Sequence, residues 1–255
     1  ERLGTYTGIR FSGIRADVDE GAINNQDRTT VEFAEQFRYQ LSPQSVLTPE
    51  YRISQTDAIN AASDSMDQYF LVGVDHRFSP NTIGIFKTGA QLRDVDQGDS
   101  GLCPYLEIAL QSQVNQQLRL GAYTRYGAEF SDTVLTDDMG TPDDDTDDLT
   151  YDYEDRRALR VGFNPKYTVT KDVSLLMGSD TILSNYNDGR NVADSNDLGD
   201  NKYENNFNAY IGFSTRLTDY LFCNLYYTYT HTFTDISDER ECVRNRISLW
   251  LSAEF

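Results

Sequence analysis

The chain has 255 residues and a formal net charge of −19, and 38% of its residues are hydrophobic. The negative charge disfavours nucleic acid as a partner because phosphates would be repelled, and no apolar run reaches the eighteen or so residues that a transmembrane helix needs. A mean hydropathy of −0.58 does not exclude a membrane β-barrel, since its strands alternate lipid-facing and lumen-facing side chains.

The first clear element in chain order is an alternating strand over Val31–Leu41. One face is apolar except for Glu35, and the other face carries Glu32, Gln36, Arg38 and Gln40. This polar face is too charged for a dry protein core. A tight turn at residues 42–45 leads into a second alternating run, Val46–Thr56, and the pattern then repeats. Residues 1–11 have neither a basic start nor an apolar core, so we expect any secretory signal peptide to have been removed or never present.

The alternation predicts about twelve strands in one all-β domain over residues 1–255, an up-and-down antiparallel transmembrane barrel. The expected ranges are 3–15, 29–41, 46–57, 67–78, 82–94, 102–113, 117–130, 156–168, 173–185, 205–217, 220–232 and 240–255. Connections alternate between short and long, which places the two kinds at opposite rims. Because such barrels have short periplasmic turns and long external loops, both termini are predicted in the periplasm of a Gram-negative outer membrane.

The two longest predicted loops, near residues 131–155 and 186–204, are strongly acidic. The first offers hard oxygen ligands for a weak divalent site that would suit Ca²⁺ or Mg²⁺, at Asp143, Asp144, Asp145, Asp147 and Asp148. The default interpretation of such a charge block is a solvated, repulsive loop. The alternative is divalent bridging to a neighbouring chain or to lipopolysaccharide phosphates.

The C-terminal strand is the most specific single feature. Apolar residues occupy alternate positions counted back from a terminal aromatic, at Ile247, Leu249, Leu251, Ala253 and Phe255. This pattern resembles the C-terminal signal of outer-membrane proteins that the barrel-assembly machinery reads. The alternative is an ordinary amphipathic strand that happens to end the chain.

Short phrases along the chain, at Tyr39–Val46, His76–Thr82, Pro104–Glu107 and Arg244–Leu249, resemble a loosely defined group of β-barrel porins in Gram-negative outer membranes. The resemblance implies a barrel fold and an outer-membrane location, whereas the solutes of that group are mostly undefined. The long acidic loops are not part of the shared pattern.

Basic residues outnumber acidic ones on the face assigned to the lumen, although the whole chain is acidic. Charged side chains that face lipid cost free energy, whereas those in a hydrated lumen do not. A lumen wall rich in arginine favours the passage of anions. The alternative is that these residues form an ion-pair network that fills a narrow barrel. The predicted pore-lining residues are Arg38, Arg52, Lys87, Arg93, Arg119, Arg125, Arg160, Lys166, Arg216, Arg244, Arg246, Glu32, Glu50, Glu107 and Glu129.

No catalytic constellation can be argued from the sequence. His76 and His231 fall on the lipid-facing side of their strands, and no Ser–His–acid triad is predicted around either. Cys103 and Cys242 lie on strands across the barrel from each other, so we expect free thiols. The chain is therefore not predicted to be an enzyme.

These observations favour a passive porin-like channel for small hydrophilic solutes, with an anion-favouring lumen and no cofactor apart from Ca²⁺ at the acidic loops. A second hypothesis is a plugged structural barrel whose acidic loops bind a surface protein, a neighbouring copy in a homo-oligomer, or divalent cations. The expected partners are outer-membrane lipid, lipopolysaccharide, the assembly machinery and the solute. A soluble β-sandwich is a distant third, because its inner faces should be apolar.

Overall fold

The computed structural model describes residues 2–14, 28–58, 64–96, 100–137, 149–186, 190–191, 201–218, 220–235 and 241–253. Almost all of these residues are extended, and none of them forms a helix that could cross a membrane. The strands are β1 (Leu3–Ile14), β2 (Arg28–Ser42), β3 (Ser45–Leu47), β4 (Glu50–Ala58), β5 (Ser65–Ser79), β6 (Thr82–Val95), β7 (Gly101–Gln113), β8 (Leu118–Asp137), β9 (Leu149–Phe163), β10 (Lys166–Thr168), β11 (Val173–Tyr186), β12 (Arg190–Asn191), β13 (Lys202–Arg216), β14 (Leu221–Thr234) and β15 (Cys242–Ala253).

The fifteen segments form one sheet in which every pairing is antiparallel and strands that follow one another in the chain lie side by side. Two strands are interrupted at a proline, between β3 and β4 and between β9 and β10. Proline has no N–H to give to the ladder, but the Pro49 carbonyl still accepts from Phe37 N at 2.9 Å and the Pro165 carbonyl from Met177 N at 3.1 Å. Depending on how interrupted strands are counted, the sheet has about 12 to 14 strands, consistent with the sequence pattern.

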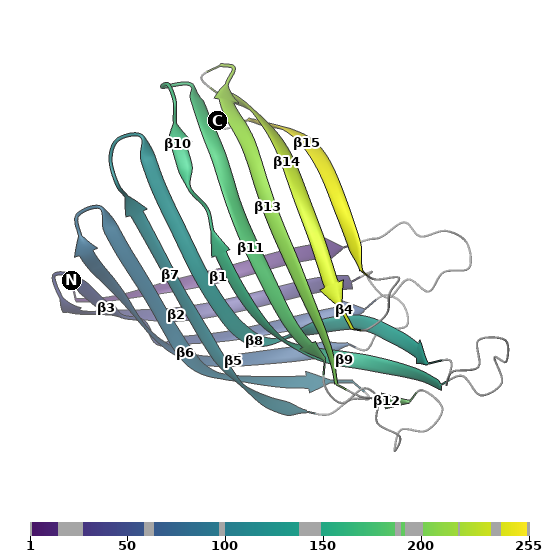
Figure 1. Cartoon of the computed structure of the whole chain (residues 1–255). Coiled ribbons are helices and arrows are strands. Elements are labelled where there is room, and N and C mark those ends of the chain that lie inside the picture. The colour runs from purple at the N-terminus through teal and green to yellow at the C-terminus, as the bar shows by residue number, and fades with distance from the viewer. Residues whose placement is uncertain are drawn as a thin grey trace.

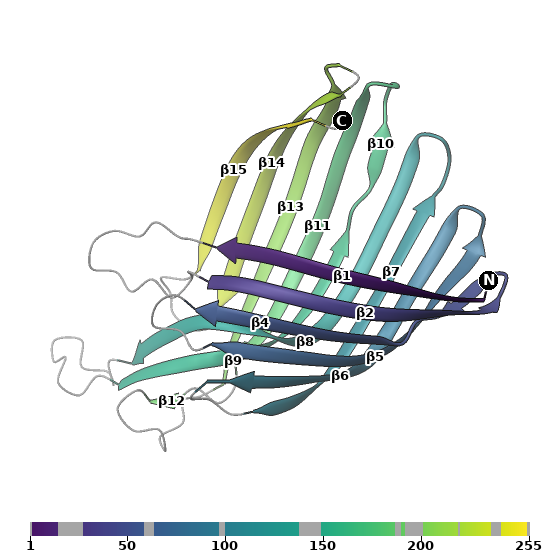
Figure 2. The same cartoon turned by 180° about the vertical axis from the view of Figure 1, so that it is seen from behind.

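The sheet is curled into a deep trough whose two edges are β1 and β15 (Figures 1 and 2). The hydrogen-bonded order runs from β1 to β15, and no pairing joins these two strands among the described residues. The short turns, the start of β1 and the end of β15 lie at one end of the trough, and the strand ends that the long connections join lie at the other (Figure 1). This is the sorting of short and long connections that the sequence predicts.

The two faces of the sheet differ in chemistry. On β2, Phe33 and Phe37 are exposed on the outer, convex face, whereas the neighbouring Gln36 is 8% exposed on the inner face. The same alternation exposes Phe70 and Val72 of β5 on the outside. The outer face is therefore apolar and the inner face polar, the reverse of a soluble β-sandwich.

One predicted loop is shorter than expected. Residues 131–155 were expected as loop, but β8 continues to Asp137 and β9 begins at Leu149, with Thr133 paired to Tyr153 and Leu135 to Tyr151. A register shift between Phe130 and Thr133 admits this extension. β-Branched and aromatic residues favour strands, and their alternation here outweighs the nearby acidic residues that suggested a loop.

Candidate functional site: the inner wall of the sheet

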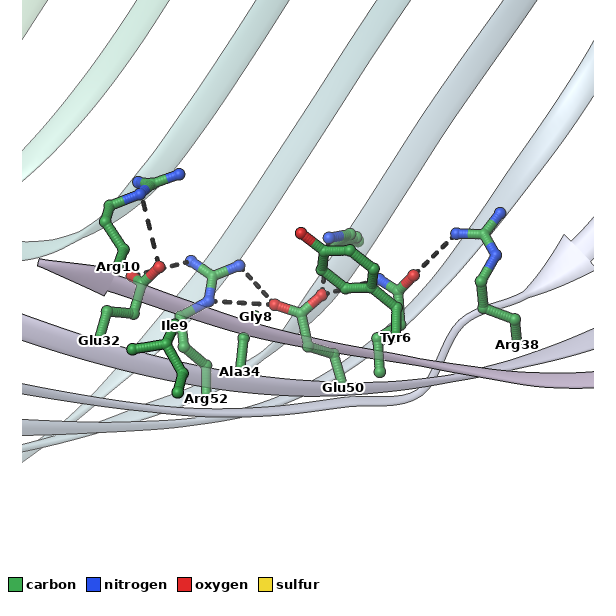
Figure 3. A pocket seen from close by; sticks show the side chains of 11 residues that line it. Tyr6, Gly8, Ile9, Arg10, Glu32, Ala34, Arg38, Glu50 and Arg52 are labelled. Atoms are coloured by element: carbon green, nitrogen blue, oxygen red, sulfur yellow. Dashed lines mark hydrogen bonds and ion pairs between the residues drawn. The ribbon is translucent and has the colours of Figure 1, made fainter.

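One charged cluster on the inner wall is centred on Glu50 of β4 (Figure 3). Its side chain is 4% exposed and accepts hydrogen bonds from Gln36 Nε2 at 2.9 Å and Lys87 Nζ at 2.7 Å. Arg52 of the same strand donates to the other carboxylate oxygen, with Nε at 3.0 Å. Residues two apart on a strand share a face, and Gln36 lies directly opposite Glu50. The buried carboxylate is thus fully paired.

The Glu50 cluster extends along the wall to β1 and β5. Arg38 donates to Gln36 Oε1 at 2.8 Å and to Asp75 at 2.6 Å. Glu32 lies 4.0 Å from both Arg52 and Arg10. These side chains surround a cavity of about 330 Å³ whose charged lining is Arg10, Arg38, Arg52, Lys87, Glu32 and Glu50. Cations outnumber carboxylates there, which gives the cavity a positive balance.

A second cluster is centred on Glu129 of β8. Its carboxylate accepts hydrogen bonds from Arg160 Nε and Nη2, each at 2.6 Å, from Arg125 at 2.8 Å and from Arg156 at 3.3 Å. Arg125 and Arg160 are directly opposite each other across β8 and β9, an arrangement that would be repulsive without a bridging anion. Glu129 supplies that anion, and Arg156 continues the network to Tyr186 at 3.2 Å.

Gln91 of β6 fills the wall between the two clusters. Its amide pairs with the peptide of Ala128, accepting from the backbone N–H at 2.9 Å and donating to the carbonyl at 2.9 Å. It also donates to Asp67, which is ion-paired with Arg93 at 2.8 Å. The ladder between β7 and β8 ends at Leu106 and Tyr126, so the Gln91 amide takes the place of a missing strand partner.

The predicted lumen residues are distributed unevenly. The structure brings Glu32, Glu50, Arg38, Arg52 and Lys87 into the first cluster, and Glu129, Arg125 and Arg160 into the second. Glu107 accepts from Tyr105 at 2.8 Å, and Arg93 is almost fully buried beside Asp67. The remaining cations lie outside both clusters: Arg119, which donates to Gln113, Arg216, which lies over the Phe222 ring, and Lys166, Arg244 and Arg246.

Several inner-wall residues are missing from the sequence prediction. Asp67, Asp75, Gln91 and Arg156 carry much of the network, and the alternation that selected Arg52 also places them on the inner face. The prediction passed over Asp and uncharged amides, and it also left out Arg156, the first residue of the predicted strand 156–168. The strand alternation could have assigned these four residues to the inner face, but it could not have identified their hydrogen-bond and ion-pair partners.

The outer face carries the remaining predicted features that the structure describes. Ile247, Leu249 and Leu251 of β15 are all exposed there, while Phe255 lies outside the described residues. The acidic residues at 143–148 that formed the candidate divalent site also lie outside them. Within the described ranges, no group of three or more His, Cys, Asp or Glu residues could hold a metal ion.

The histidines and cysteines form no recognisable catalytic arrangement in the described part of the chain. Ser45 Oγ lies 2.9 Å from His76 Nδ1, a contact that the sequence did not predict, and the outer side of His76 packs against Phe78 at 4.7 Å between ring centroids. A hydrolytic triad needs a further group that orients the histidine, and no such contact accompanies this pair among the described residues. Cys103, Cys223 and Cys242 form no disulfide among the described residues.

No protein-family model matches the chain, and no curated protein matches it by sequence. Among solved structures, the NanC porin is 11% identical with a TM-score of 0.38, over 98% of this chain and 99% of that chain. The KdgM porin is 9% identical with a TM-score of 0.32, over 99% of each chain. OmpT, an outer membrane protein of Vibrio cholerae, is 9% identical with a TM-score of 0.42, over 99% and 96%. The structural neighbours are thus outer-membrane porins and channels, but at these scores the likeness by itself carries no function to this chain.

Proposed function

We propose that this chain is a closed outer-membrane β-barrel that acts as a passive channel for small hydrophilic solutes, with an anion-favouring lumen. The observation that carries the proposal is the segregation of the two faces, with ion-pair clusters around Glu50 and Glu129 inside and exposed aromatic and aliphatic side chains outside. Apolar surface of this extent is unfavourable in water and favourable against lipid.

Closure of the barrel follows from the cost of open edges in lipid. Each unpaired N–H or C=O in hydrocarbon costs several kcal/mol, so spanning sheets are closed. We propose that β1 pairs with β15 and that about twelve strands surround the lumen. With the short turns in the periplasm, both ends of the described chain lie on the periplasmic side and the acidic connections face outward.

The anion bias rests on the charge of the inner wall. Glu50 and Glu129 are each shared by several cations, so part of the positive charge is not neutralised by carboxylates. Rings or tracks of Arg and Lys select anions in pores. No enzymatic chemistry or cofactor is part of this proposal, with Ca²⁺ at the acidic loops as the one exception.

A plugged scaffold is the second candidate, and the wall around Gln91 favours it. Gln91 is fully buried and Arg93 is 3% exposed, so side chains exclude water from this sector. In that case the acidic loops would provide the function by binding a surface protein, a neighbouring copy or divalent cations. Under either candidate, the assembly machinery would read the C-terminal strand, and lipid and lipopolysaccharide would surround the barrel.

Single-channel conductance of the detergent-purified protein in planar bilayers separates the two candidates. We expect steady openings with a reversal potential that indicates anion preference under a salt gradient. Replacing Arg38, Arg125 and Arg246 with glutamine should reduce that preference, because each change removes one positive charge from the inner wall. Arg157→Gln, which removes a charge from the outer face of β9, is the matched control. Silence from demonstrably inserted protein would refute the channel and favour the scaffold.

A further inference from the structure

Positive charge is concentrated on the inner face next to the two free edges of the sheet. The inner-facing positions of β1, β2, β14 and β15 carry five arginines and a single carboxylate, Glu32. No inner-facing position of β14 is charged at all. The arginines are Arg10, Arg28, Arg38, Arg244 and Arg246.

Three of these arginines lack a close carboxylate. The Arg10 side chain is 76% exposed, and its nearest carboxylate is Glu32 at 4.0 Å, which Arg52 approaches at the same distance. Figure 3 shows Arg10 at one end of the Glu50 cluster, next to Glu32. Arg244 and Arg246 lie opposite Thr230 and Thr228, and neither has an ion-pair partner in the part of the chain that the structure describes.

These three positions come to a similar height when the sheet closes. β1 ends and β15 begins at the rim of the long connections, so the two strands are antiparallel to each other (Figure 2). Arg10 stands four residues before the end of β1, and Arg244 and Arg246 stand two and four residues after the start of β15. Side chains on one face of adjacent strands lie within about 8 Å of one another.

We infer that pairing of β1 with β15 assembles a binding site for a small, multiply charged oxyanion from Arg10, Arg244 and Arg246. This inference rests on the proposed closed barrel. Three guanidinium groups on adjacent strands repel one another unless an anion lies between them, and guanidinium groups bind phosphate-like oxyanions through paired, charge-assisted hydrogen bonds. The cavity of about 330 Å³ beside Arg10 could hold the uncharged part of a larger anionic solute next to β1 and β2.

The site is tested by calorimetric titration of inorganic phosphate into the full-length protein folded in detergent. We expect saturable binding in the unaltered protein. Each of Arg10→Gln, Arg244→Gln and Arg246→Gln should weaken binding about tenfold or more, the effect of losing one hydrogen bond to a charged group. The triple variant should show no binding heat. Arg157→Gln should bind like the unaltered protein, because it faces outward.

The outcomes separate this inference from the proposed channel. Absence of phosphate binding, or binding that the triple variant retains, overturns the proposed oxyanion site between β1 and β15, even if the protein conducts. Binding that depends on the three arginines in a protein that does not conduct supports the site and refutes the channel. Circular dichroism must show that each variant keeps its strand content. If the triple variant does not fold, the loss of phosphate affinity in the three single variants tests the site.

Discussion

At the scale of single residues, the inner wall depends on a few carboxylates that each serve several cations. Glu129 is bonded by three arginines from two strands, and Glu50 by two cations and an amide. Removing a shared carboxylate leaves several partly desolvated guanidinium groups without a counter-charge, which costs more than the loss of one ordinary ion pair.

Glu129→Gln is therefore expected to destabilise the folded protein by about 2–4 kcal/mol, somewhat less than breaking a fully buried pair costs, because the side chain is only partly buried. Urea unfolding in detergent micelles measures the change. Glu35→Gln is the matched control, since Glu35 is partly exposed on the outer face and bonded to the hydroxyl of Thr7. Equal midpoints for the two variants would contradict the central role of Glu129.

At the scale of elements, a side chain takes over from the backbone ladder of β7 and β8 beyond Leu106 and Tyr126. The sheet pairs these strands only from Leu106 to Gln113 on β7, and Pro104 cannot donate. A Cβ atom at position 127 would lie only 2.9 Å from Gln91 Oε1. Glycine at this position therefore lets the Gln91 amide reach the β8 backbone. The buried Gln91 thus joins β6 to β8 across β7.

Gln91→Leu tests this element-scale link. The change keeps the approximate volume but leaves the Ala128 N–H and carbonyl without their partner, at about 1–3 kcal/mol for each buried unsatisfied group. We expect lower stability in urea and faster hydrogen exchange of the Ala128 amide. Gln55→Leu, in which an exposed amide bonded only to Asp57 is lost, should change neither quantity. Unchanged exchange at Ala128 would show that the amide pairing is not stabilising.

At the scale of the whole molecule, the proposed barrel depends on the two edges of the curled sheet. Every strand except the two edges and the two-residue β12 has hydrogen-bonded neighbours on both sides. The edges expose Ile9 and Phe11 of β1 and Ile247 of β15 on the outer face. Such edges template pairing with another strand. In a membrane, the pairing that leaves no exposed backbone is that of β1 with β15.

Closure predicts a specific cross-link. Cys242 is a free thiol at the start of β15, and Ile14 ends β1 at the same rim on the same face. In a protein with Cys103 and Cys223 replaced by alanine, Ile14→Cys should form an intramolecular disulfide with Cys242, which requires Cα atoms within about 7 Å. Mass spectrometry under oxidising conditions detects the bond. Leu3→Cys, at the other end of β1, should not react, and intermolecular bonds in place of intramolecular ones would argue for pairing between copies.

The alternation of side chains in the sequence determined most of the architecture. Period-two patterns such as Val31–Leu41 define strands and faces locally, because residue i and residue i+2 necessarily share a face. The lengths of the connections predict which strand ends lie at the same end of the sheet. The same patterns placed Arg52, Glu50 and Glu129 on the inner face. Only the tertiary structure decided their partners, since Arg160 of β9 reaches Glu129 of β8, and Gln91 of β6 reaches Ala128 of β8 across β7. Pairing depends on register and sheet curvature, which sum over many strands and are not encoded in any one segment.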